Sequence, residues 1–165
     1  GTPHGSGAGN VVLEVSATPY LYSLRFYDWL RRDADGTQRP VHVEHAFRNL
    51  DTGRRGGAVR RDLVQQPRTL DAGNGWRVEL LGALPEMFFE VRRLVLGPAA
   101  RAVQRAGDRF HVLNLVDGDG VTVHWSAGAH QLSYAETIVI PAATGSYQLV
   151  PDGPAAARVL QAVVR

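Results

Sequence analysis

The chain has 165 residues, 44% hydrophobic and 21% charged, which is typical of one globular domain or of a domain with part of another. It has no cysteine, which excludes a disulfide framework and any cysteine-ligated zinc or iron–sulfur site. No apolar run is long enough for a membrane helix, and no signal-peptide pattern opens the sequence. We therefore expect a cytoplasmic protein that does not bind a membrane.

The charge is modest and comes from an unusual source. All 18 basic residues are arginine, set against 16 acidic residues, and the surplus lies in residues 31–68. A nucleic-acid surface would combine a basic groove with stacking aromatic rings, and this segment has only Phe47. We interpret it as a solvated surface and expect no nucleic-acid partner.

The N-terminal segment predicts a glycine-rich turn followed by two strands. The glycines of "GSGAG" at 5–9 precede a strand, so they indicate a tight turn, because a phosphate loop needs a helix N-terminus behind it. Strands are expected at 10–16 and 22–29, with a proline-containing breaker between them. Arg25 lies inside the second strand, where it either has a buried partner or is a surface arginine with a solvated head.

Residues 30–74 are polar and read as a linker with one helix at about 41–51. Pro40 suits a first turn, and Glu44 and Arg48 are spaced to pair. One apolar stripe follows at helical spacing: Val43, Ala46, Phe47 and Leu50. His42 and His45 share a helix flank, which can bind a metal but which we interpret as a hydrated surface.

Residues 75–165 predict a succession of short strands, which is typical of an antiparallel sandwich or barrel. The expected ranges are 76–80, 87–96, 110–116, 121–125, 137–140, 146–150 and 157–164. The run "DGDG" at 117–120 predicts a hairpin in which Phe110, Val112 and Val116 face Val121 and its neighbours. That pairing would put His111 and His124 on one face, as a two-histidine metal site or as hydrogen-bonded imidazoles.

The order of motifs resembles the C-terminal half of type I mannose-6-phosphate isomerases. The motifs are "GTPHGSGAGNVVLEV", "SLRFYDW", "RPVHVEHAFRNLD", "FHVLNLVDGDG" and "YAETIVIPAATGSYQL", and together they cover essentially the whole chain. The resemblance implies an all-β, cupin-like antiparallel barrel or sandwich (a jelly roll) with a short linker helix. Residues 1–29 would be closing strands of a truncated catalytic barrel, and 75–165 a C-terminal barrel without metal. Near 103–106, where a cupin metal motif would place its histidine pair, the sequence has none.

The resemblance also implies an activity and a site. The family interconverts mannose 6-phosphate and fructose 6-phosphate through an enediol, with one zinc ion held by a Gln, two His and a Glu. His4 matches the last zinc ligand, and Arg25 matches the strand arginine that acts beside the enediol. The other ligands and a phosphate-binding lysine would come from an N-terminal barrel segment of the same protein or of another chain. The isolated chain would then be nearly inactive.

The family pattern around the strand arginine is changed here to "LEVSATPYLYSLR", which leaves the exact sugar substrate undetermined. Two other interpretations of the chain also stay open. The chain could instead be a non-catalytic sugar-binding or oligomerising cupin module. It could also be a scaffold subunit that completes the barrel of a separate catalytic chain.

Overall fold

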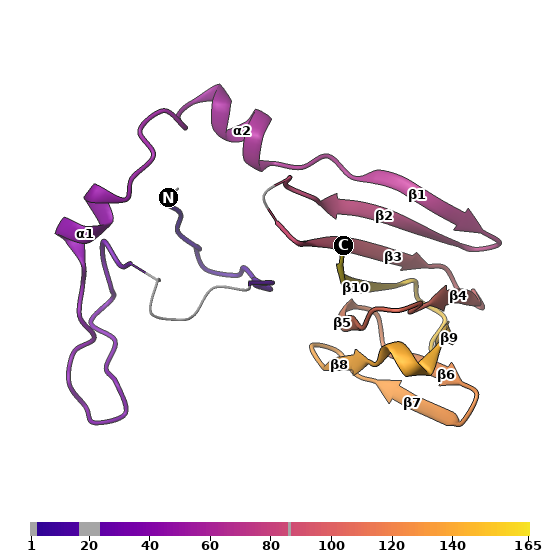
Figure 1. Cartoon of the computed structure of the whole chain (residues 1–165). Helices are drawn as coiled ribbons and strands as arrows, with labels where there is room; N and C mark the ends of the chain where they lie inside the picture. Colours follow the sequence, from indigo (N-terminus) through magenta and orange to yellow (C-terminus); the bar gives the residue numbers. More distant parts are fainter. Residues whose placement is uncertain (1–2, 17–23, 86) are drawn as a thin grey trace. The chain divides into compact units, whose positions relative to one another are not determined.

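The computed structural model describes residues 3–16, 24–85 and 87–165, and the chain divides into two compact units, Gly1–Val64 and Gln65–Arg165 (Figure 1). The second unit is a sandwich of two antiparallel sheets, and the first holds short helices and irregular segments. This confirms the expected antiparallel β-sandwich with short helices. No helix in the described ranges is long and apolar enough to cross a membrane.

A six-stranded sheet and a four-stranded sheet form the sandwich. The first has the order β1-β2-β3-β10-β5-β8, with bounds Arg68–Gly73, Trp76–Gly82, Phe89–Leu96, Ala157–Val164, His111–Asp117 and Thr137–Ile140. The second has the order β4-β9-β6-β7, with bounds Ala102–Arg105, Ser146–Pro151, Val121–Trp125 and Gly128–Leu132. A 3-10 turn, η2 at Ala142–Thr144, leads from β8 into β9.

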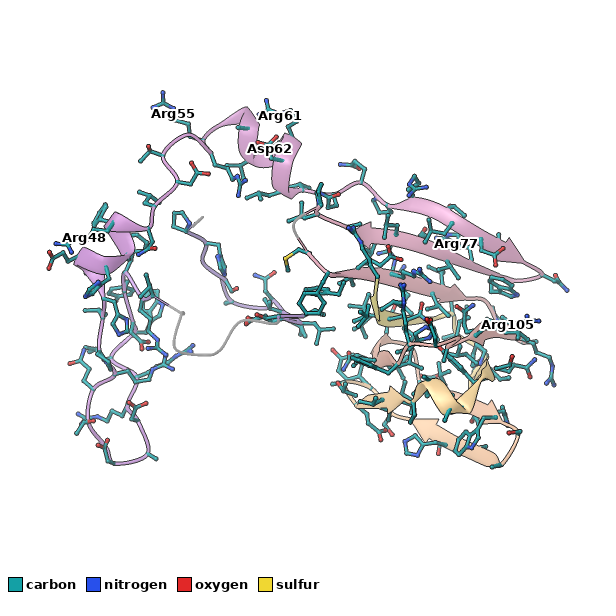
Figure 2. The ribbon with its side chains drawn as sticks, viewed as in Figure 1. Arg48, Arg55, Arg61, Asp62, Arg77 and Arg105 are labelled. Carbon is teal, nitrogen blue, oxygen red and sulfur yellow. The ribbon has the colours of Figure 1, made fainter. Side chains whose placement is uncertain are left out.

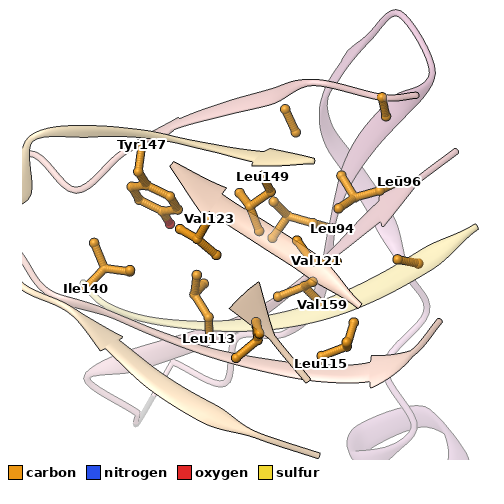
Figure 3. Close-up of a cluster of buried hydrophobic side chains, with 14 of the residues drawn as sticks. Leu94, Leu96, Leu113, Leu115, Val121, Val123, Ile140, Tyr147, Leu149 and Val159 are labelled. Carbon is orange, nitrogen blue, oxygen red and sulfur yellow. The ribbon is translucent and has the colours of Figure 1, made fainter. Parts of the chain in front are cut away.

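Alternating apolar residues of the two sheets meet in one core (Figure 3). Because side chains on a strand alternate between faces, β10 buries Ala157, Val159 and Gln161 while Arg158 stays outside. The other sheet contributes Val121, Val123, Tyr147 and Leu149. Burial of these apolar surfaces provides most of the free energy that holds the sheets together.

The predicted hairpin at "DGDG" is wrong. Strand β5 pairs with β10 and β8, whereas β6 pairs with β9 and β7, so residues 118–120 cross from one sheet to the other. The buried residues of β5 are His111, Leu113, Asn114 and Leu115, and Phe110 is exposed. Both strands therefore bury a face in the shared core from opposite sides, which two strands of a single hairpin cannot do.

Several elements of the structure were not expected from the sequence. β1, in the segment read as linker, pairs along β2, and helix α2 spans Gly57–Leu63. β4 and β7 also escape the sequence pattern. β1 and α2 contain no buried residue, so they carry no apolar alternation that could reveal them.

The two strands predicted near the N-terminus are absent from the described residues of the first unit. Residues 10–16 form no strand, nor do 24–29, and the intervening 17–23 lie outside the described residues. Val11 is 84% exposed and Val12 69%. A strand needs a neighbouring strand for its backbone groups, and within the described residues no strand or β-bridge pairs with either segment. A turn does form at Ala8-Gly9, as the glycine-rich run predicts.

The expected linker helix is present as α1 at Val43–Arg48, and Arg48 pairs with Glu44 at 2.5 Å. Of its predicted stripe only Ala46 is buried, while Phe47 packs edge-on against Phe26. Figure 2 shows the side chains of Arg48 and Arg61 projecting outward from the two helices, consistent with a solvated basic surface.

Gly118 is expected to be the least replaceable residue of the sheet-to-sheet connection. Its φ is +107°, and an added Cβ would lie 2.9 Å from both Cα and Cβ of Ala157. Gly107 has a φ of +66° but open space around it, so it is a matched control for backbone strain alone. We expect Gly107→Ala to cost about 1 kcal/mol and Gly118→Ala roughly 3 kcal/mol in urea unfolding. Equal costs would contradict the close packing of Gly118 on β10.

Candidate functional site

Arg25 lies near a buried carboxylate in the first unit. The side chain of Asp28 is 4% exposed, and its Oδ2 lies 2.7 Å from Nε of Arg39 and 4.0 Å from Nε of Arg25. The side chain of Arg25 is itself 19% exposed. Arg39 is thus the closer partner of Asp28, and Arg25 lies at the limit of an ion pair on the same oxygen.

A short loop brings Arg39 back to Asp28. Backbone hydrogen bonds join Asp33 to Thr37 and Arg39 to Arg31, and Gly36 takes a φ of +80° at the turn. The carboxylate of Asp35 accepts hydrogen bonds from both the backbone N–H and the hydroxyl of Thr37, which fixes the turn further. Residues 31–39 therefore return the chain on itself and present Arg39 to a residue eleven positions earlier.

The charges around Asp28 determine its protonation. The hydrogen bond from Arg39 lowers the pKa of the Asp28 carboxyl below its ordinary value, although burial acts in the opposite direction. The nearby charges of Arg39 and Arg25 lower it further. Asp28 is consequently a carboxylate at neutral pH, and its charge keeps the two guanidinium groups beside it.

His42 fixes the backbone of Arg25 as well. The backbone N–H of His42 donates to the carbonyl of Arg25 at 2.7 Å, and the ring Nδ1 of His42 accepts from the backbone N–H of Arg25 at 3.3 Å. His42 is also the N-cap of α1, so the helix start and Arg25 are joined by two hydrogen bonds. The hydrated flank expected for His42 is thus incorrect for this histidine, whereas His45 is exposed.

His4 lies in the irregular segment before the Ala8-Gly9 turn, and its side chain is exposed. Residues 17–23, between the segments of His4 and Arg25, lie outside the described residues. Within the described ranges, no three side chains of His, Asp or Glu gather as a metal site. One imidazole cannot fill the tetrahedral coordination of zinc, so these residues do not by themselves form the expected centre.

The sandwich contains a second polar cluster, which the sequence did not reveal. His111 Nδ1 lies 2.8 Å from the hydroxyl of Tyr147, and Gln161 Nε2 lies 2.8 Å from that hydroxyl and 3.1 Å from Nδ1. All three residues are buried, and Gln161 is completely so. In β10 every second residue is buried, and Gln161 is a polar residue at one of these buried positions. This break in the alternation is the sequence feature that could have indicated the cluster.

The surroundings of this cluster keep its groups neutral. Burial lowers the pKa of His111, and the nearby charge of Arg92 lowers it further. Burial raises the pKa of the Tyr147 hydroxyl far above its usual range. At pH 7 the cluster is therefore a neutral imidazole, a phenol and an amide, linked by hydrogen bonds.

The predicted proximity of His111 and His124 is wrong, because β5 and β6 lie in different sheets. His124 is exposed on the outer face of the four-stranded sheet, where it pairs across from Gln148. There it lines an open groove of about 260 Å³ with Val103 and Ser146 among the other lining residues. The two histidines cannot form a shared metal site in this arrangement.

No protein-family model matches the sequence, and no curated protein matches it either. Solved structures do. The mannose 6-phosphate isomerase of Bacillus subtilis matches with a TM-score of 0.61 at 16% identity, over 84% of this chain and 39% of that one. A cupin-2 domain from Rhodospirillum rubrum matches at 0.51 and 13% identity, over 60% and 68% of the two chains. A cupin-superfamily sugar phosphate isomerase from Silicibacter pomeroyi matches at 0.48 and 18%, over 64% and 73%.

The first two of these similarities establish the fold. The sandwich is cupin-like, as expected, and the chain spans well under half the length of the Bacillus subtilis isomerase.

The buried neutral His111 is expected to make stability depend on pH. Its pKa is lowered in the folded protein, so the unfolded chain takes up a proton first as pH falls below about 6.5. The free energy of unfolding should therefore decrease between pH 7.5 and pH 5.5, by at most about 1.4 kcal/mol per pH unit for one proton. The pKa values of the Asp28, Glu79 and Glu136 carboxyls are lowered too, but their contribution to the free energy of unfolding is lost only at more acid pH.

Urea unfolding at both pH values measures this dependence. Replacing His111 by Gln should remove that share of the slope, while His124→Gln at the exposed position is the control. A His111→Gln protein with an unchanged slope would contradict the burial of a neutral imidazole.

Proposed function

We propose that this chain forms part of a sugar-phosphate aldose–ketose isomerase of the mannose 6-phosphate to fructose 6-phosphate type. The observation that supports this most is the position of Arg25, whose backbone is hydrogen-bonded to His42 and whose Nε lies 4.0 Å from the buried carboxylate of Asp28. A surface arginine with a solvated head needs no such partner. A guanidinium placed to act on a substrate must be held in one position, and the backbone bonds to His42 add to that restraint.

The structural similarity is in keeping with the proposal. The match to the Bacillus subtilis isomerase covers 84% of this chain, which is more than the sandwich unit Gln65–Arg165 contains. The likeness therefore extends beyond a generic cupin sandwich into the first unit, where His4 and Arg25 lie. The sequence motifs around both residues follow the same family order.

The proposed chemistry assigns a separate task to each residue. Isomerisation removes a proton from a carbon beside the sugar carbonyl, and negative charge develops on the enediolate oxygens. The Arg25 guanidinium would stabilise that charge, and Asp28 would hold the guanidinium in place. A zinc ion, when bound, would polarise the same oxygens as a Lewis acid. His4 would bind that ion through one neutral ring nitrogen, and the other ligands would come from outside the described residues.

The chain alone should bind zinc weakly and isomerise poorly. His4 provides a single imidazole, and no other described residues complete a metal site around it. Zinc titration by calorimetry should give no stoichiometric tight binding, and a coupled assay for fructose 6-phosphate should give little turnover. Tight one-to-one zinc binding by the 165-residue chain would contradict this part of the proposal.

The roles of His4 and Arg25 can be tested separately. The intact mass and metal content of the protein from its natural source are measured first, and variants of that protein are then compared with it. His4→Ala should reduce the metal content. Arg25→Ala should lower kcat by about 10²-fold or more while the metal content stays unchanged. Arg31→Ala, at an exposed neighbouring arginine, is the control. Wild-type activity in both variants would contradict the roles proposed for His4 and Arg25.

A further inference from the structure

The outer face of the four-stranded sheet carries a row of residues that takes no part in the core. Register places Val103 on β4, Gln148 on β9, His124 on β6 and Ala129 on β7 side by side across all four strands. The residue before His124, Val123, is fully buried in the core. Because side chains on a strand alternate between faces, the row lies on the solvent side of the sheet.

An open groove of about 260 Å³ lies along this row and is lined by Val103, His124 and Gln148. Its other lining residues are Trp125, Ser126, Ser146 and Tyr147. None of these lining residues carries a carboxylate. The hydroxyl, amide and imidazole groups among them can donate hydrogen bonds, so the lining offers donors without adding negative charge.

Two arginines adjoin the groove on the β4 side. Arg105 lies directly opposite Ser146, and Figure 2 shows its side chain extending from the end of β4. It is exposed and has no ion-pair partner within the described part of the chain. Arg101, just before β4, is also exposed, and its Nη1 donates to Oε1 of Gln148 at 3.5 Å. The groove is therefore bordered by positive charge.

A carboxylate on the same face is already engaged elsewhere. Asp152, which follows β9, accepts hydrogen bonds from Thr122 Oγ1 at 2.5 Å and from Gln131 Nε2 at 3.1 Å, one on each carboxylate oxygen. Among the described ion pairs, none joins Asp152 to either arginine beside the groove. The two guanidinium groups are consequently available to an anion from solution.

We propose that this groove binds a small phosphate monoester, with the phosphoryl group between Arg105, Ser146 and His124. A guanidinium matches phosphate oxygens with two parallel hydrogen bonds, and the hydroxyl and the ring N–H can donate to the remaining oxygen. A phosphoryl group offers three acceptor oxygens and close to two negative charges, which suits two arginines and several donors better than a carboxylate does.

The rest of the groove favours an ester over a free phosphate ion. Val103 is 51% exposed, and the half-buried Trp125 presents part of its indole in the same lining. These apolar surfaces can cover an organic group attached to the phosphate. The volume is at the lower end of ligand pockets, which commonly measure about 300–1,000 Å³, so it suits a small molecule. The site involves neither His4 nor Arg25 and is independent of the proposed isomerase function.

NMR titration of the full chain with phenyl phosphate tests the proposal, with inorganic phosphate and phenol as the other probes. We expect saturable shifts of the His124 ring and the Trp125 indole N–H with phenyl phosphate, at a Kd of about a millimolar or lower. Inorganic phosphate should bind at least about threefold more weakly, because it lacks the organic group. Raising NaCl from about 50 to about 500 mM should weaken binding several-fold, since the arginines are exposed.

Arg105→Gln should raise the Kd for phenyl phosphate about fivefold, the effect of losing one exposed charge pair. Arg68→Gln removes the same charge from an exposed position on β1, in the other sheet, and is the matched control. His124→Gln should weaken binding as well, and all three substitutions lie at exposed positions that the core does not need.

Three results would overturn the proposal. The first is no saturable shift with phenyl phosphate. The second is an equal effect of Arg105→Gln and Arg68→Gln on its Kd, which would show only the influence of net charge. The third is equal binding of phenyl phosphate and one of the other probes. Equality with phenol would leave an apolar groove without anion recognition, and equality with inorganic phosphate would assign the groove to the free ion.

Discussion

Burial of one face of β10 between β3 and β5 is the constraint on which the sandwich depends. β10 pairs with β3 along its whole length, from Ala157 opposite Leu96 to Val164 opposite Phe89. Because side chains alternate with a period of two, a slip of one residue would expose Val159 and bury Arg158. The apolar residues therefore fix the register, and the register in turn places Gln161 between Arg92 and Leu113. The polar cluster is a by-product of the same pairing that assembles the core.

The sequence predicts strands well where one face is apolar, and poorly where a strand depends on its neighbour. The ranges around β3, β5, β6, β8, β9 and β10 follow from alternation and turn residues. The edge strand β1 is exposed throughout, so it forms through its pairing with β2 and shows no alternating pattern in the sequence. The "DGDG" run correctly marks the end of one strand and the start of the next. It does not indicate whether the chain returns within one sheet or crosses to the other, because both routes need the same backbone freedom at Gly118.

The candidate sites show a similar division. Arg25 attracts notice as a charged residue in an apolar strand pattern, but its partners come from packing. Asp28 is close in sequence, whereas Arg39 reaches it only because residues 31–39 fold back. The apolar run at Val11–Leu13 predicts a strand, yet a strand forms only when a neighbour supplies the other half of its hydrogen bonds. Gln161 is the opposite case, since a polar residue at a buried phase was visible in the sequence and its neighbours were not.

The burial of Asp28 distinguishes its ion pairs from the others in the first unit. Dissolved ions screen charges that water surrounds, and they act much less on charges that the protein encloses. The Glu44–Arg48 pair on α1 has both side chains largely exposed, so added salt weakens it readily. Asp28 is enclosed by the chain, and Arg25 and Arg39 are mostly covered. The position of Arg25 is therefore insulated from the ionic strength of its surroundings, whereas the arginine-rich exterior responds to every change in it.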